Sequence, residues 1–216
     1  MPSTVANKNN QLRKNLRQQR RSLRPASQVI ASQQLSQRLL QVKGVLGAKR
    51  IATYQASDGE IQLDHFIQQR RKKSHIKFYS PKINVRTKQL RFHFQPHHQR
   101  GFTKHPWGFV EPTNCRALSY KKLDIILLPL VAFSSNGYRL GMGGGFYDRA
   151  LSYRNPSSHH HKSMKPILIG VAHEFQKQDG FIVETWDIPC DYIVTDKAIY
   201  SASMNTNLSL AKRLRT

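Results

Sequence analysis

Residues 124–151 read DIILLPLVAFSSNGYRLGMGGGFYDRAL. The apolar run at the start predicts a strand over 124–130 that is buried on both faces of a sheet. A polar turn follows, and a helical pattern occupies 147–153. Between turn and helix stand four glycines, Gly141, Gly143, Gly144 and Gly145. A buried strand followed by a glycine-rich loop and a helix is typical of α/β proteins, where binding loops follow the ends of strands.

The rest of the chain repeats this alternation of short apolar runs with helical patterns. Four further strands are predicted at residues 51–54, 75–80, 167–172 and 192–195, each rich in Ile, Val, Leu, Phe and Tyr. A helical pattern at 63–72 separates the first two. We therefore predict an α/β fold with a mostly parallel central sheet and helices on both faces. The polar, broken sequence at 81–122 predicts long loops or an excursion from the sheet.

The amino-terminal segment is predicted to be helical and strongly basic. Residues 9–23 carry leucines at helical spacing, with arginines and lysines around them. Pro25 should break this helix, and Ser27 should cap a second one. These two N-terminal helices precede the first predicted strand.

Length and composition are those of a single globular domain. The chain has 216 residues, of which 38% are hydrophobic, and no apolar run is long enough to span a membrane. We place one compact domain at residues 1–200 and a flexible tail at 201–216. Residues 1–10 lack the apolar core of a signal peptide, so we expect a cytoplasmic protein without a membrane partner. We separately expect a monomer. Cys115 and Cys190 stand in no metal-ligand spacing.

The charge balance is unusual. Lysine and arginine number 35 against 12 aspartate and glutamate, a formal net charge of +23. Such a surface attracts polyanions, either as general background that also draws in an anionic substrate or as a dedicated nucleic-acid interface. Charge alone does not separate these readings. The histidines at 159–161 form a loop run without further ligands, which is more typical of a solvated segment than of a metal site.

The glycine-rich loop is the segment best suited to chemistry. Glycines at this density let backbone N–H groups converge on an anion, with support from the positive end of the following helix. Arg139 can contribute a charged fork to phosphate oxygens, and Asp148 offers an oxygen ligand to Mg²⁺. The pattern is neither the P-loop nor the dinucleotide fingerprint, whose third glycine position is Phe146 here. The alternative is a tight turn in which glycine serves only close packing.

This loop and several shorter motifs resemble the 5-formyltetrahydrofolate cyclo-ligase family. The main signature is RLGMGGGFYD at 139–148, preceded by Pro129, Ala132-Phe133 and Gly137. The further matches are Leu12-Arg13, Tyr54, Glu60-Ile61, Trp107-Gly108, Glu111-Pro112, Ile169-Gly-Val-Ala172 and Asp187-Ile-Pro-Cys-Asp-Tyr-Ile-Val-Thr195. Together they cover residues 9–196. Two positions depart from the family pattern, since Asn9 stands where lysine is frequent and Phe146 where tyrosine is common.

The resemblance implies an activity and a site. The family uses ATP and Mg²⁺ to convert 5-formyltetrahydrofolate into 5,10-methenyltetrahydrofolate, releasing ADP and phosphate. ATP would be bound by Asn9, Asn10, Gln11, Leu12, Arg13, Arg139, Leu140, Gly141, Met142, Gly143, Gly144, Gly145, Phe146 and Tyr147. The folate would be bound by Gln55, Glu60, Trp107, Met142, Gly143, Gly144, Gly145 and Phe146, with the Trp107 indole as a stacking wall. Asp148 and Asp187 would support the metal, and Arg139 and Asp148 would act in catalysis.

Simpler roles exist for some of these residues. Glu60 could merely begin a helix, where a carboxylate favours the positive dipole end. Asp187 could be a turn carboxylate. Two other functions also stay open at this point: a nucleic-acid-binding module, which would explain the charge but not the glycine loop, and a kinase or ligase acting on another small anion.

Overall fold

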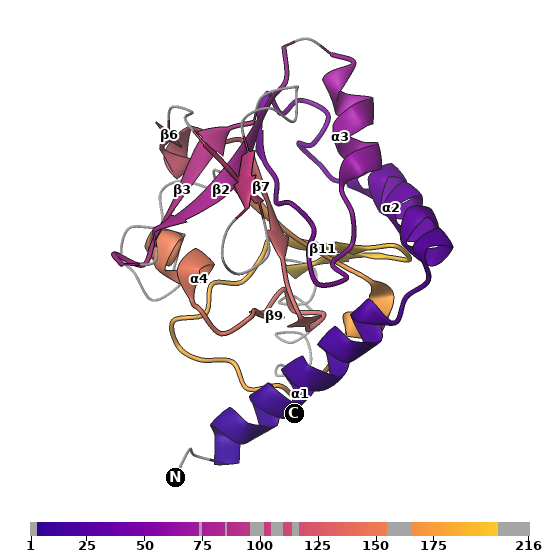
Figure 1. The fold of residues 1–216 in the computed structure, drawn as a ribbon, viewed down its shortest axis with the longest axis vertical. Helices are drawn as coiled ribbons and strands as arrows, with labels where there is room; N and C mark the ends of the chain where they lie inside the picture. The colour runs from indigo at the N-terminus through magenta and orange to yellow at the C-terminus, as the bar shows by residue number, and fades with distance from the viewer. Residues whose placement is uncertain are drawn as a thin grey trace, which may run out of the picture.

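A computed structural model of the protein describes residues 4–73, 75–84, 86–95, 102–104, 110–113, 117–154 and 166–202. These residues form an eight-stranded sheet in the order β12-β11-β10-β7-β1-β2-β3-β6, shown in Figure 1. The strands are β1 (Arg50–Ala52), β2 (Lys77–Asn84), β3 (Gln89–Phe94), β6 (Ala117–Leu118), β7 (Ile125–Pro129), β10 (Ile167–Ala172), β11 (Tyr192–Thr195) and β12 (Ile199–Ser201). The five central strands, β11 to β2, pair in parallel, and the strands at both edges are antiparallel.

The core has one layer on each face of the sheet and a third, smaller cluster around Leu16. Along β7 the side chains of Ile125 and Leu127 enter one cluster, whereas Ile126 and Leu128 enter the other, because successive side chains of a strand point to opposite faces. All four are at most 1% exposed. The prediction of a strand buried on both faces is therefore confirmed.

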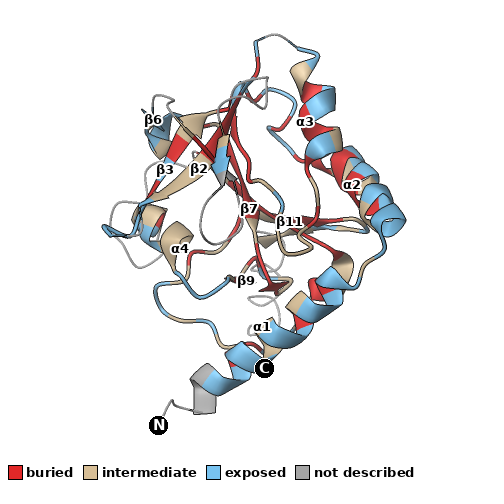
Figure 2. Cartoon of the chain, in the orientation of Figure 1, coloured by how far each residue is buried: buried red, intermediate tan, exposed pale blue. Residues whose placement is uncertain are grey.

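Helices cover both faces, as predicted. The α-helices are α1 (Thr4–Arg21), α2 (Pro25–Leu39), α3 (Asp64–Arg71) and α4 (Phe146–Ala150). In Figure 1, α2 and α3 lie side by side against one face, α4 lies on the other, and α1 stands apart near β9 (Arg139–Leu140), which pairs with β8 (Ala132–Phe133). Figure 2 shows buried residues along the strands and the inner sides of α2 and α3, while α1 exposes much of its surface. No helix within the described ranges is long and apolar enough to cross a bilayer.

Local predictions were wrong at several points. Ser27 does not cap the second helix, because α2 begins two residues earlier at Pro25, whose fixed φ and missing N–H suit the first helical position. The helix predicted at 147–153 is split into α4 and the 3₁₀ turn η2 (Ser152–Arg154). The tail at 201–216 stays a prediction: Ser201 ends β12, and residues 203–216 lie outside the described part.

The largest difference lies between residues 81 and 122. Instead of leaving the sheet, β2 continues to Asn84 and forms an antiparallel hairpin with β3, in which Pro81 pairs with Phe92. The two small strands β4 (Phe102–Lys104) and β5 (Val110–Pro112) then pair with each other outside this sheet, which is the predicted excursion, and β6 returns to pair with β3. A short 3₁₀ turn, η1 (Tyr120–Lys122), leads into β7, and another, η3 (Glu174–Gln176), follows β10.

Candidate active site

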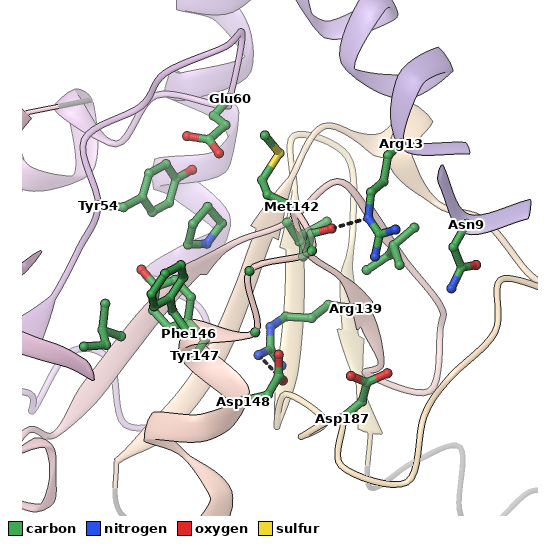
Figure 3. Close-up of a pocket in the computed structure, with 18 of the residues that line it drawn as sticks. Asn9, Arg13, Tyr54, Glu60, Arg139, Met142, Phe146, Tyr147, Asp148 and Asp187 are labelled. Carbon is green, nitrogen blue, oxygen red and sulfur yellow. Dashed lines mark hydrogen bonds and ion pairs between the residues drawn. The ribbon is translucent and has the colours of Figure 1, made fainter. Parts of the chain in front are cut away.

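One large cavity lies beyond the carboxyl ends of β1 and β7, where open α/β sheets bind ligands. Its volume is about 1060 Å³. Its walls come from α1, the loop after β1, the β2–β3 hairpin, the glycine loop between β9 and α4, and the segment 182–187. Figure 3 shows Glu60 and Tyr54 on one side of Met142, with Asn9 and Arg13 on the other. The glycine loop thus stands between two halves of the cavity.

The glycines of this loop are needed for different structural reasons at different positions. Gly143 and Gly145 have φ of 95° and 61°, which side chains disfavour. A Cβ on Gly144 would meet the Phe146 ring at 2.6 Å, so close packing accounts for this glycine. At Gly141 a Cβ would meet nothing within 4 Å, which leaves open space at the cavity wall. Close packing therefore explains the glycine at position 144 and not the one at position 141. The open space beside Gly141 suits an anionic ligand.

The helix after the loop is shorter than predicted. α4 has five residues and begins after Gly145, which is its N-cap in the left-handed conformation. A helix dipole grows with the number of aligned peptide units, so the support that α4 gives to an anion is small. Positive charge at the cavity must come mainly from side chains.

Among the described residues, three arginines line the cavity, and two of them, Arg13 and Arg139, flank the glycine loop. Arg13 donates from Nε to the carbonyl of Gly141 at 2.8 Å and from Nη1 to Oδ1 of Asn10 at 2.8 Å. Burial lowers the pKa of Arg13, and Asp187 acts in the opposite direction. Arg139, 7% exposed, donates to the carbonyl of Ile188 and, at 2.7 Å, to Oδ1 of Asp148. The sequence-predicted arginines therefore both line the cavity beside the glycine loop.

Two carboxylates face the same part of the cavity (Figure 3). Asp148 accepts hydrogen bonds at Oδ1 from Arg139 and from the backbone N–H of Ile188. Asp187 accepts at Oδ2 from the N–H of Glu184 at 2.9 Å. Burial raises the pKa of Asp187, and the neighbouring Asp148 raises it further. Within the described ranges no three His, Cys, Asp or Glu side chains form a metal-binding group, so a cation here would need ligand oxygens as well.

The other half of the cavity contains the carboxylate of Glu60 and two tyrosines. Glu60 has a side chain that is 13% exposed, and its Oε2 accepts from the N–H of Ser57 at 3.1 Å. Burial raises the pKa of Glu60, although the hydrogen bond from Ser57 and the charge of Arg20 oppose the rise. Tyr54 is buried and Tyr147 is half-buried beside Glu60, and burial raises the pKa of both hydroxyls well above the ordinary range. This half would suit an uncharged, flat ligand that donates a hydrogen bond to the carboxylate of Glu60.

Most of the predicted site residues line the cavity. They are Asn9, Asn10, Arg13, Gln55, Glu60, Arg139, Asp187 and every residue from Leu140 to Asp148. Gln11 and Leu12 lie outside the lining: Gln11 is exposed and donates to Asn15, and Leu12 packs against the cluster around Leu16. Trp107 lies outside the described residues.

Asn9 has a role that the sequence did not indicate. Its amide donates to the carbonyl of Ile182 at 3.0 Å and accepts from the N–H of Ile182 at 3.1 Å. This buried pair ties α1 to the segment 182–187. The side chain is thus engaged in holding the cavity wall, whereas a lysine at this position could reach a ligand.

Several lining residues were missed by sequence reasoning. They are Arg17, Tyr54, Ser57, Asp58, Pro81, Ile83, Leu90, Pro129, Leu130, Ile182, Glu184 and Trp186. Trp186, 62% exposed, precedes Asp187, and this adjacency was the available signal for it. The hairpin residues carried no signal because the strand β3 itself was not predicted.

The chain is similar to known proteins over most of its length. The model of the 5-formyltetrahydrofolate cyclo-ligase family matches residues 5–196. The 5-formyltetrahydrofolate cyclo-ligase of Escherichia coli (strain K12) is 32% identical over 187 residues, covering 86% of this chain and 98% of that protein. Its counterpart in Haemophilus influenzae is 34% identical over 185 residues, covering 84% and 94%.

Solved structures give the same result. The 5,10-methenyltetrahydrofolate synthetase from Aquifex aeolicus superposes with a TM-score of 0.73 at 27% identity, covering 90% of this chain and 92% of that one. The enzyme of the same name from Mycoplasma pneumoniae gives a TM-score of 0.68 at 26% identity, covering 88% and 99%. Since the family match, the relatives and the fold all extend over nearly the whole described chain, the protein belongs to the 5-formyltetrahydrofolate cyclo-ligase family.

Proposed function

We propose that the protein is a 5-formyltetrahydrofolate cyclo-ligase, which uses ATP to close 5-formyltetrahydrofolate to 5,10-methenyltetrahydrofolate with release of ADP and phosphate. The observation that carries the proposal is the single cavity, which unites Arg13, Glu60, Arg139, Asp148 and Asp187 from distant parts of the sequence. ATP belongs to the half with the arginines and carboxylates. The folate belongs to the half with Glu60, Tyr54 and Tyr147.

The chemistry requires activation of the formyl oxygen, which does not leave as oxide under mild conditions. Attack of this oxygen on the γ-phosphorus of ATP forms the new O–P bond and releases ADP. The folate N10 then closes on the formyl carbon and loses its proton to solvent, and the C–O bond breaks as phosphate departs. Arg13 and Arg139 offset negative charge on the phosphates, and the glycine loop lies between the two reactants. No protein nucleophile takes part, so catalysis rests on positioning.

The residues present fit Mg²⁺. Mg²⁺ in phosphoryl-transfer sites is typically bound by one or two carboxylates together with phosphate oxygens and water. Asp148 and Asp187 supply two carboxylates on the same part of the cavity; burial raises the pKa of Asp187 and the charge of Asp148 adds to the rise, so a cation beside them would be favourable. The metal would neutralise charge on the phosphates, and Asp148 and Asp187 would hold it.

The decisive measurement is the near-ultraviolet absorbance of methenyltetrahydrofolate. Purified protein should produce this chromophore from 5-formyltetrahydrofolate only when both ATP and Mg²⁺ are present. ADP should appear in equal amount. A folded protein that hydrolyses or transfers phosphate without producing the chromophore would point to another small-anion kinase or ligase.

Glu60→Gln should separate substrate binding from stability. Loss of the charged acceptor should raise the KM for 5-formyltetrahydrofolate roughly 10- to 100-fold, which corresponds to one hydrogen bond to a charged group.

Because the pKa of Glu60 is raised in the folded state, its stability contribution is complete below the unfolded pKa and is lost as pH rises through the folded pKa. The variant should therefore have a higher Tm than wild type at pH 7, with the difference vanishing toward acid pH. Thermal melts of both proteins at several pH values test this, and a lower Tm at pH 7 would contradict it.

We further propose that the β2–β3 hairpin binds the carboxylates of a polyglutamylated folate. Its basic face forms a second hollow lined by Lys82, Arg86, Arg91 and His93, and Ile83 lines both this hollow and the main cavity. The glutamate tail of a bound folate could therefore extend directly onto it.

Removing two charges from this face should weaken polyglutamate binding selectively. Arg86→Ala combined with Arg91→Ala should raise the KM for a pentaglutamate substrate about tenfold at low salt, since each exposed ion pair contributes up to about 1 kcal/mol. The monoglutamate KM should not change, and Lys43→Ala, an exposed lysine outside both hollows, is the control. If added glutamates leave the wild-type KM unchanged at low salt, the proposal fails.

The high positive charge does not by itself favour a nucleic-acid function. On α1, Arg17, Arg20 and Arg21 all bind Asp58 and are engaged within the protein. We propose that binding to polyanions is weak and non-specific, with a steep salt dependence measurable on RNA. A cytoplasmic location and a monomeric state complete the proposal, and cell fractionation and light scattering test them.

A further inference from the structure

The residue that carries the folate-side carboxylate stands on a tight turn. Glu60 donates its backbone N–H to the carbonyl of Ser57 at 2.9 Å, and the two residues between them, Asp58 and Gly59, have φ of 52° and 73°. Positive φ at both central residues is the property of a type I′ turn, for which Asp-Gly is a favoured pair. The side chain of Glu60 folds back onto the N–H of Ser57. The orientation of this turn therefore determines where the carboxylate lies.

Asp58 ties this turn to α1 through three arginines. Its Oδ2 accepts from Nε of Arg17 at 2.7 Å and from Nη2 of Arg20 at 2.8 Å, and its Oδ1 accepts from Nε of Arg21. Burial alone would raise the pKa of Asp58, but these hydrogen bonds bring it below its ordinary value. The Asp58 carboxylate is thus ionised, and both of its oxygens accept hydrogen bonds from arginines of α1.

Arg20 is the inner member of this group. Its side chain is 0% exposed, and it also donates to the carbonyls of Asp58 at 3.2 Å and Leu130 at 3.1 Å. A Cβ on Gly59 would meet the carbonyl group of Arg20 at 2.6 Å, so the turn rests directly on the backbone of α1. The turn has little freedom to move independently of the helix.

The same helix contacts the other half of the cavity. Arg13 bonds to Gly141 of the glycine loop, and Asn9 bonds to Ile182. From Asn9 to Arg21, α1 therefore contacts the nucleotide-side loops at one end and the turn of Glu60 at the other.

We propose that Asp58 is a positioning residue that fixes Glu60 relative to α1 and thereby aligns the folate half of the cavity with the ATP half. Asp58 itself touches no reacting atom in this assignment. The inference rests on the proposed cyclo-ligase activity. It adds that Asp58 sets the distance between the two bound substrates.

Asp58→Asn is the informative variant. Asparagine tolerates positive φ and keeps the turn, but it loses the charge that three arginines share. The KM for 5-formyltetrahydrofolate should rise about tenfold, and kcat should fall by about the same factor because the formyl oxygen is displaced from the γ-phosphorus, while the KM for ATP stays within twofold. Calorimetric binding of 5-formyltetrahydrofolate without ATP should weaken by the same factor. Asp124→Asn, which also disturbs an aspartate paired with an arginine, Arg50, is the matched control and should leave both KM values unchanged.

Each outcome has a definite meaning. An inactive but folded wild type removes the cyclo-ligase proposal, and calorimetry then tests Asp58 alone. An active wild type with an unchanged folate KM in Asp58→Asn overturns the positioning role, as does an equal rise in both KM values. Where Asp58→Asn does not fold, Arg21→Gln removes a single, 55% exposed partner and should raise the folate KM by a smaller factor; no rise there also overturns the proposal.

Discussion

Replacing Arg139 with alanine should reduce kcat/KM for cyclisation roughly a thousandfold and lower the free energy of unfolding by about 3 kcal/mol. Arg139 is nearly buried between the carbonyl of Ile188 and the carboxylate of Asp148. Its removal takes a cation from the phosphate side of the cavity and leaves Asp148 without its ion-pair partner. The activity loss is measured at saturating ATP and Mg²⁺, and the stability loss by urea unfolding.

Arg154 offers a matched control for this experiment. It donates to the carbonyl of Pro166 at 2.9 Å and to Oδ1 of Asp191 at 2.6 Å, which is the same arrangement outside the cavity. Arg154→Ala should therefore cost similar stability, yet the folded variant should keep activity within about threefold. If both variants lose activity equally, the effect of Arg139→Ala is structural, and Arg139 has no direct role in the reaction.

Asp148→Asn should lower kcat by about two to three orders of magnitude and raise the Mg²⁺ concentration needed for half-maximal rate. Asparagine keeps the shape of the side chain and an oxygen that can accept from Arg139, so the loop should stay in place. The measurement is a Mg²⁺ titration of the cyclisation rate at fixed ATP. A variant with reduced kcat but an unchanged Mg²⁺ requirement would show that Asp148 serves Arg139 and not the metal.

Asp191→Asn is the control for this second experiment. Asp191 accepts from Arg154 and from the N–H of Leu168, so it resembles Asp148 in its partners but lies at the start of β11. Its replacement should reduce stability and leave the Mg²⁺ titration unchanged. Together the two aspartate variants separate loss of an ion pair from loss of a metal ligand.

The sequence predicted the parts of the site that are local. The strand at 124–130 and the glycine loop after it are adjacent in sequence, and their composition alone indicates burial and an anion-binding turn. The order of strands and helices also predicted a mostly parallel sheet, since these connections follow from alternation. The positions of Arg139 and Asp148 on either side of the loop follow from the same segment.

The rest depends on contacts between distant segments. Nothing near Asp58 indicates that three arginines of α1 would surround it. The hairpin of β2 and β3 was missed because Pro81 and the charged residues after it are typical of loops. In the structure Pro81 instead pairs with Phe92 in an antiparallel strand, where tertiary packing outweighs local preference.

The position of α1 has a consequence for the order in which the protein becomes active during synthesis. The first helix leaves the ribosome early, but Gly141 follows Arg13 by 128 residues and Ile182 follows Asn9 by 173. At about 5–20 residues per second, this helix waits many seconds for its partners. The cavity can close only after most of the chain has emerged, so a nascent chain that stops short of Ile182 has an unfinished active site.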